Sequence, residues 1–380
     1  MKQYLDLLKN IITNGVEKES GRENMPNTIG ISHADIKMDL SDGFPLLTTK
    51  KMHYKGIIHE LLWFIRGETN IKYLVDNNTN IWNGDAYRWY LKHRELGIEA
   101  YNRMNTYETI DGKNTLSGRL DLDVPYSMET FVEMIKNSDR SMTVASLGNK
   151  YMLGDLGKVY GYQWRNQNGV DQVKDVVDGL KSNPYSRYHI IDGWNKADFR
   201  EMALPPCHLL YQFIVRPLTF KERRDLAREY AEANNKLPLA IYAFGDKGIP
   251  SYMDVIDNTG WNIPKFYLDL NMYQRSCDTF LGVGFNIASM SILLKIMAKV
   301  SGMVAGVAYW TGGDTHVYVD HIHAINEQLS RTPTKLPELE ILKDLKTLED
   351  IESLTIDDFK LIDYVSLPAI KAELFTGLKK

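Results

Sequence analysis

The stretch Leu204-Pro205-Pro206-Cys207-His208 constrains the fold more than any other part of the sequence. Two consecutive prolines fix φ twice and donate no backbone hydrogen bond, so the chain turns there through a rigid, unpaired corner. The apolar run 209–215 predicts a strand that begins at this corner. A cysteine on such a corner can face a cleft, where a neighbouring histidine could help it lose its proton. The alternative is that Cys207 is a small buried apolar residue.

Composition limits the class of protein. The chain has 380 residues, of which 44% are hydrophobic and 25% charged, as expected for one soluble α/β domain with additions. A net charge of −4 argues against a general nucleic-acid or membrane-surface binder, because that binding needs a basic excess. The two cysteines, Cys207 and Cys277, are too few for a disulfide framework or a cysteine-rich zinc site, which predicts a reduced, cytoplasmic setting. No apolar run approaches the length of a membrane span.

Hydrophobic periodicity predicts the main elements within a single domain, residues 1–380. Apolar residues at helical spacing predict helices that end at residue 14, over 53–66, over 173–180 and over 285–302. Alternation predicts strands over 29–40, 189–194 and from 266 onward, with a loop over 17–28. Residues 83–152 are expected to form an irregular insertion with a helix over 128–137. Residues 216–264 are expected to form a second insertion, with a charged, solvated helix near 221–234.

Polar residues within these elements are candidates for chemistry. Glu60 lies among apolar neighbours, so it is either a capped structural group or an acid with a raised pKa. Arg275 falls on the polar side of an alternating strand. His316 and Tyr318 are two residues apart in an extended segment, which places both on one side of it. Each also has a structural alternative, such as a core imidazole for His316.

The sequence resembles the thymidylate synthase family in motifs that follow the family order. The resemblance implies an α/β (α+β) fold with a large mixed β-sheet packed against helices, and a homodimer built sheet against sheet. It also implies one-carbon transfer from 5,10-methylenetetrahydrofolate to C5 of dUMP, with no metal. The matching stretches are Asp42–Lys50, His59–Phe64, Gly154–Arg165, Leu204–His208, Gln274–Asp278, Phe285–Ser289 and Thr311–Tyr318.

The resemblance also implies roles for single residues. Cys207 would add to C6 of uracil so that C5 becomes a nucleophile, Glu60 would move protons, and Tyr160 and His208 would complete the catalytic set. The residues expected to bind the nucleotide are Arg22, Arg187 (from the partner subunit), Arg275, Ser276, Asn286, His316 and Tyr318. The residues expected to bind the folate are Lys50, Trp82, Asp278, Leu281, Gly282 and Phe285.

Four departures from the family pattern leave the product open. Tyr188 follows Arg187 where a second arginine is usual, and the loop around Arg22, the pair Val283-Gly284 and the C-terminal residues 372–380 are altered. Because the family's last residues close over the folate, a changed tail could admit water. The main prediction is therefore dTMP, and the alternative is a hydroxymethylase that gives 5-hydroxymethyl-dUMP. A third hypothesis, an inactive relative that binds RNA or a protein, is disfavoured by the presence of Cys207, Glu60 and Asn286.

Overall fold

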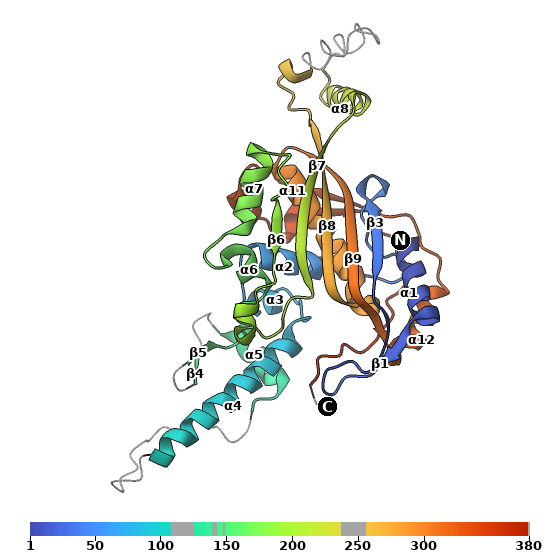
Figure 1. Ribbon diagram of the computed structural model, residues 1–380. Coiled ribbons are helices and arrows are strands. Elements are labelled where there is room, and N and C mark those ends of the chain that lie inside the picture. Colours follow the sequence, from blue (N-terminus) through green and yellow to red (C-terminus); the bar gives the residue numbers. More distant parts are fainter. Residues whose placement is uncertain (108–124, 139–142, 147–148, 237–255, 379–380) are drawn as a thin grey trace.

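The computed structural model describes residues 1–107, 125–138, 143–146, 149–236 and 256–378, and a large sheet forms its centre (Figure 1). Among these residues seven strands make up the sheet, in the order β1-β2-β9-β8-β7-β6, with β3 paired to another part of β9. Every pairing is antiparallel except that of β8 with β9. The predicted mixed sheet is therefore confirmed. The strands are β1 (Val16–Lys18), β2 (Thr28–Ile31), β3 (Ala34–Asp39), β6 (Ile190–Asp192), β7 (His208–Pro217), β8 (Phe266–Asp278) and β9 (Val304–Tyr318).

Helices cover one face of the sheet, and Figure 1 shows the other face open. The parallel pair β8 and β9 needs a crossover, which α11 supplies. Two smaller strand pairs lie outside the sheet, β4 (Thr143–Ser146) with β5 (Asn149–Met152) and β10 (Glu338–Ile341) with β11 (Phe359–Ile362). The helices are α1 (Lys2–Asn14), α2 (Tyr54–Ile65), α3 (Lys72–Asp76), α4 (Asn83–Tyr107), α5 (Met128–Asn137), α6 (Tyr160–Asn166), α7 (Gln172–Ser182), α8 (Phe220–Ala233), α11 (Gly284–Val300), α12 (Ile322–Leu329) and α13 (Leu348–Glu352).

Two helices, α2 and α11, are apolar almost all round, which is typical of helices inside a core. By length and hydropathy alone the stretch Thr279–Val300 is long and apolar enough to cross a membrane, although Lys295 interrupts its apolar run. In the fold, 67% of its most apolar 18 residues are buried inside the protein. It therefore serves as the central core helix, which packs against the sheet.

The structure corrects two predicted elements. Residues 83–107, expected to be irregular, form the long helix α4, whose alternating charges and aromatic residues gave no clear apolar stripe in the sequence. The predicted strand over 29–40 is divided into β2 and β3 by a bend. The pairs Ile31↔Thr315 and Ala34↔Gly312 keep one register with β9 across that bend.

The two predicted insertions pack differently. In the first, side chains of α4, α5 and β5 join the main hydrophobic core, among them Trp89, Phe131 and Tyr151. In the second, α8 builds a separate small cluster from Ala227, Ile256 and Ile263, at the far end of β7 and β8 in Figure 1. That both segments are insertions into one domain stays a prediction.

Candidate active site

The corner at Cys207 is held by hydrogen bonds to the proline carbonyls and to the Cys207 backbone. Arg275 Nε donates to the Pro206 carbonyl at 2.7 Å, and its Nη2 donates to the Pro205 carbonyl at 2.9 Å. The Cys207 amide donates to the Tyr160 hydroxyl at 2.7 Å, and the Arg275 amide donates to the Cys207 carbonyl at 2.8 Å. The cysteine is therefore fixed from β8 on one side and from α6 on the other.

Cys207 is partly exposed as a residue, and the nearby charges of Arg275 and Arg22 act on its thiol. Burial raises the pKa of the Cys207 thiol, and the Arg275 guanidinium, whose Nη2 lies 4.0 Å from Sγ, opposes that rise. The Tyr160 hydroxyl and the charge of Arg22 also lower this pKa. Since the thiolate is the reactive form, these groups favour nucleophilic attack by Cys207.

His208, the predicted catalytic neighbour, lies in an aromatic cage. Its Nδ1 lies 2.6 Å from the Tyr211 hydroxyl, and its ring packs against Tyr160 with centroids 4.6 Å apart. Burial lowers the pKa of His208 to about 4, so the ring is neutral near pH 7. No hydrogen bond joins it to Cys207 in the described part of the chain, so this geometry supports the corner rather than proton removal from the thiol.

Glu60 is buried on α2 and is held by one indole. Trp82 Nε1 donates to Glu60 Oε1 at 2.7 Å, and the Trp82 ring packs against Trp63 and Tyr160 at 5.8 and 5.7 Å. Burial raises the pKa of Glu60 to about 7, although the Trp82 hydrogen bond acts against the rise. A carboxyl group with this pKa can both give and take a proton near neutrality.

Asn286 is oriented by residues that the sequence analysis did not identify. Trp310 Nε1, which can only donate, lies 2.9 Å from Gln274 Oε1, so the Gln274 amide nitrogen must face the other way. That Nε2 donates to Asn286 Oδ1 at 3.1 Å. These two hydrogen bonds leave Asn286 Nδ2 available as a donor, and Asn286 Oδ1 keeps a second lone pair that can accept. Gln274 belongs to the stretch Gln274–Asp278 that resembles the family. Its role in orienting Asn286 depends on a tertiary contact with Trp310, which the sequence does not reveal.

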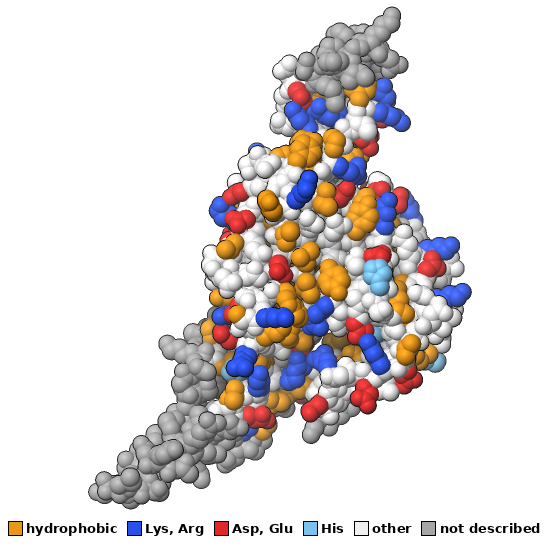
Figure 2. All heavy atoms as spheres, in the orientation of Figure 1, with side chains coloured by type: hydrophobic (Ala, Val, Ile, Leu, Met, Phe, Trp, Pro, Cys, Tyr) orange, Lys and Arg blue, Asp and Glu red, His pale blue; other side chains and the backbone are white. Residues whose placement is uncertain are grey.

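The other nucleotide candidates fall into two groups. His316 and Tyr318 are both buried on β9 with ring centroids 5.7 Å apart. Ser276 lies on the neighbouring strand β8, where it pairs in register with Asp314 of β9. Arg187 is exposed just before β6 and is absent from the main charges acting on Cys207, which are Arg275, Arg22 and Asp85. Figure 2 shows Lys and Arg side chains gathered over the ends of the central strands, between α4 and the C-terminal end.

Four of the six folate candidates, Asp278, Leu281, Gly282 and Phe285, lie at the turn between β8 and α11. Asp278 Oδ1 accepts from the amides of Phe280 and Leu281, both at 3.1 Å, and Gly282 lies against Asn286. Leu281 and Phe285 are partly exposed. Lys50 is different, because it is almost fully buried and its Nζ donates to the Phe280 carbonyl at 2.5 Å. Burial lowers the pKa of Lys50 to about 8.

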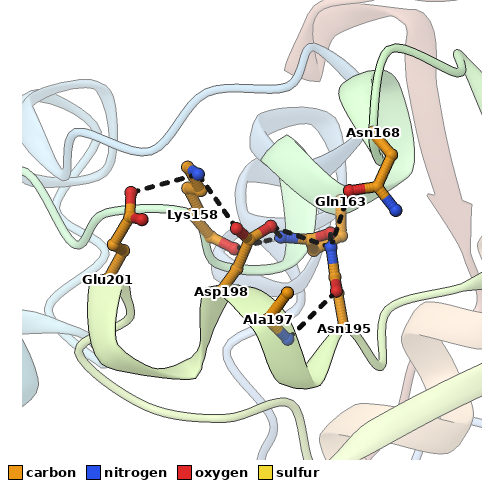
Figure 3. Close-up of polar contacts among 7 residues, drawn as sticks. All are labelled: Lys158, Gln163, Asn168, Asn195, Ala197, Asp198 and Glu201. Carbon is orange, nitrogen blue, oxygen red and sulfur yellow. Dashed lines mark hydrogen bonds and ion pairs between the residues drawn. The ribbon is translucent and has the colours of Figure 1, made fainter.

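A polar network supports the segment that leads to the corner, and sequence reasoning missed it (Figure 3). Asp198 accepts hydrogen bonds from Lys158, Gln163 and Asn195, each at 2.9 Å. Lys158 also pairs with Glu201 at 3.0 Å. Because Gln163 belongs to α6, the network joins the helix of Tyr160 to the chain just before the corner.

A thiol fixed beside a guanidinium, together with a buried carboxyl group whose pKa is raised by burial, is the kind of arrangement that enzymes of covalent addition use. A profile of the thymidylate synthase family matches residues 2–242 and 252–376. The chain belongs to the thymidylate synthase family and is a folate-dependent one-carbon transferase.

Similar proteins cover nearly the whole chain. The thymidylate synthase of Mycoplasma mobile is 40% identical over 374 residues, which are 98% of this chain and 99% of that protein. Those of Malacoplasma penetrans and Listeria monocytogenes serotype 4a are 37% and 35% identical, with the same shares covered. Such coverage includes the segments predicted to be insertions, so these segments do not separate the chain from proteins named thymidylate synthase. The hydroxymethylase alternative is therefore not favoured.

Proposed function

We propose that the protein converts dUMP to dTMP, with 5,10-methylenetetrahydrofolate as the donor of both the one-carbon unit and the hydride. The observation that carries the proposal is the Cys207 corner, which Arg275 and Tyr160 hold by hydrogen bonds. The same chain also holds a buried carboxyl group, Glu60, whose pKa is raised to about 7. These groups have the nucleophilic and acid–base properties that the reaction needs.

Cys207 begins the reaction by addition to C6 of the uracil ring. The new S–C6 bond moves the ring electrons toward O4 and makes C5 nucleophilic. Arg275, 4.0 Å from the sulfur, stabilises the thiolate that attacks. Glu60 supplies a proton toward O4 when protonated and accepts one when ionised, and both forms are populated near its pKa of about 7.

Asn286 selects uracil. With Gln274 fixing its orientation, Asn286 Nδ2 donates to O4 and its Oδ1 accepts from N3–H. Cytosine presents the reverse pattern and would leave buried polar groups unpaired, at about 1–3 kcal/mol each. Turnover of dCMP should therefore be at least about tenfold lower than that of dUMP. Equal turnover of the two nucleotides would contradict this assignment.

The folate fits the partly apolar wall next to Asn286. Leu281 and Phe285 are partly exposed and offer apolar and aromatic surface, and Asp278 keeps its Oδ2 as an acceptor because Oδ1 caps the following turn. Their task is to orient the folate and exclude water, so that hydride rather than water completes the product. For Lys50 to reach the folate, its Nζ must leave the Phe280 carbonyl.

The proposed dimer uses the open face of the sheet. Figure 2 shows hydrophobic side chains gathered over β7 and β8 on this face, and the exposed large residues there are Ile214, Tyr273 and Tyr309. Pairing two such faces would bring Arg187 of one subunit to the phosphate bound by the other. Arg22 and Arg275 would complete the group of arginines that binds the phosphate. Arg275 Nε and Nη2 donate to proline carbonyls, whereas Arg275 Nη1 makes no hydrogen bond to the described residues.

A mixing experiment tests the shared site. Cys207→Ala and Arg187→Ala should each be nearly inactive alone, yet refolded together they should recover about one quarter of wild-type activity, because half the dimers then hold one complete site. No recovery, although mixed dimers form, would place Arg187 in the site of its own subunit.

The product is tested by following dihydrofolate absorbance and nucleotide mass together. We expect dihydrofolate and dTMP in equal amounts. Release of tetrahydrofolate with a hydroxymethyl nucleotide, and without dihydrofolate, would overturn the proposed function.

A further inference from the structure

The C-terminal tail, residues 367–378, is anchored on the nucleotide side of the site. The Phe375 ring packs against Tyr318 and His321 with centroids 4.9 and 5.0 Å apart, and the Glu373 carbonyl lies 2.9 Å from His321 Nε2. Asn24, from the loop that carries Arg22, donates to the Gly377 carbonyl at 3.4 Å. The tail thus rests on the side chains next to the proposed ribose and phosphate contacts.

The same tail is held on its other side by the first turns of α4. Arg88 Nη1 donates to the Thr376 carbonyl, and Arg88 Nη2 pairs with Asp85. Gly84 lies directly under the tail, because a Cβ added there would stand 2.5 Å from Thr376 Cγ2. The absence of a side chain at Gly84 therefore allows the tail to approach the helix.

These contacts lie beside the reacting groups. Gly84 is two residues from Trp82, which holds Glu60. The Asp85 carboxylate is also close enough to act on the Cys207 thiol, whose pKa it raises in opposition to Arg275. The tail therefore passes from Tyr318 to the start of α4 across the region between the proposed nucleotide and folate contacts.

We propose that Gly84, Asp85 and Arg88 form a receptor for the tail on α4, and that Arg88 is a positioning residue that keeps the tail closed over the site. Arg88 donates to a carbonyl of the tail with one nitrogen and is held in place by Asp85 with another. The effect on turnover rests on the proposed function, but docking of the tail on α4 does not.

Hydrogen exchange of the full-length, unliganded protein tests the docking. In Arg88→Ala the amides of residues 373–378 should exchange about tenfold faster than in wild type, as expected for the loss of one charge-assisted hydrogen bond. Lys92→Ala, an exposed change one turn further along α4, is the matched control and should leave that exchange unchanged. Wild-type protection in Arg88→Ala would overturn the proposal.

A steric rescue provides a second, independent test. Alanine is the better helix former, yet Gly84→Ala should release the tail, because the new Cβ meets the Thr376 side chain. Removing that side chain in Gly84→Ala/Thr376→Gly should restore slow exchange relative to Gly84→Ala. If Gly84→Ala alone keeps wild-type exchange, or the double variant gains no protection, the receptor is wrong.

Kinetics separate this inference from the proposed function. In Arg88→Ala the KM for methylenetetrahydrofolate should rise about tenfold while the KM for dUMP changes less than about twofold, and Arg88→Lys should recover part of the loss. If the wild type does not turn over dUMP, the proposed function fails while the exchange data still decide the docking. If turnover is normal and Arg88→Ala changes neither exchange nor KM, only the inference fails.

Discussion

The two cysteines lie near each other on neighbouring strands but in opposite environments. Cys207 is partly exposed on a corner that Arg275 and Tyr160 hold, and a guanidinium lies 4.0 Å from its sulfur. Cys277 is fully buried, its Sγ donates to the Gln274 carbonyl at 3.3 Å, and burial raises its pKa to about 12. The surrounding groups, rather than the residue type, therefore favour Cys207 over Cys277 as the proposed nucleophile.

The largest effect should come from removing the exposed thiol. Cys207→Ala should lower kcat by more than about 10⁴-fold, because no other described group can add to C6, while dUMP still binds. The same change at Cys277 should leave kcat within about twofold of wild type. Steady-state kinetics and equilibrium dialysis with dUMP measure both. An active Cys207→Ala with an inactive Cys277→Ala would reverse the comparison.

The next effect concerns Glu60, the proposed acid–base group. Glu60→Gln should lower kcat by about 10²–10⁴-fold, and the limb of the wild-type pH profile near pH 7 should disappear. Gln keeps the shape and the Trp82 contact but cannot transfer a proton. A Glu60→Gln enzyme that keeps the wild-type profile would assign proton transfer elsewhere.

Stability gives an independent measure of the Glu60 pKa. Because the folded-state pKa is raised to about 7, the folded protein binds more protons than the unfolded chain between about pH 4.5 and pH 7. The free energy of unfolding of the wild type should therefore fall, relative to Glu60→Gln, by about 2–3 kcal/mol as pH rises through that range. Urea titrations at pH 5 and pH 8 would show this, and parallel curves would contradict the buried carboxyl.

The cation beside Cys207 sharpens the comparison further. Arg275→Gln removes the charge that opposes the raised thiol pKa, so alkylation of Cys207 by iodoacetamide at pH 8 should slow by about tenfold. Cys277 should stay unlabelled in both proteins while they are folded. Peptide mass spectrometry measures each site, and no change at Cys207 would show that Arg275 does not act on the thiol.

The smallest effect on chemistry should come from the network behind the corner. Asp198→Asn removes the charged acceptor shared by Lys158, Gln163 and Asn195, and should lower the free energy of unfolding by about 1–3 kcal/mol. The folded variant should keep kcat within about tenfold of wild type, since none of these residues contacts Cys207. Unchanged thermal stability would mean that the network does not support the segment.

Much of this arrangement follows from the sequence, and the missing parts have physical reasons. The two prolines predict the corner, and helical spacing predicts the buried position of Glu60, because both signals are local. The orientation of Asn286 depends on Trp310 through Gln274, and the anchoring of the tail depends on Arg88. These contacts join residues far apart in the chain, so no spacing rule reveals them. Helix α4 was missed because its aromatic and charged residues lack a clear apolar stripe.

The central claim, covalent catalysis by Cys207, is tested most directly by trapping the adduct. An analogue of dUMP with fluorine at C5 cannot lose a proton there, so the covalent complex formed with methylenetetrahydrofolate should persist. Digestion and peptide mass spectrometry should then place the nucleotide and folate masses on the peptide that contains Cys207, with none on Cys277. An adduct on Cys277, or no adduct from enzyme that turns over dUMP normally, would contradict the account.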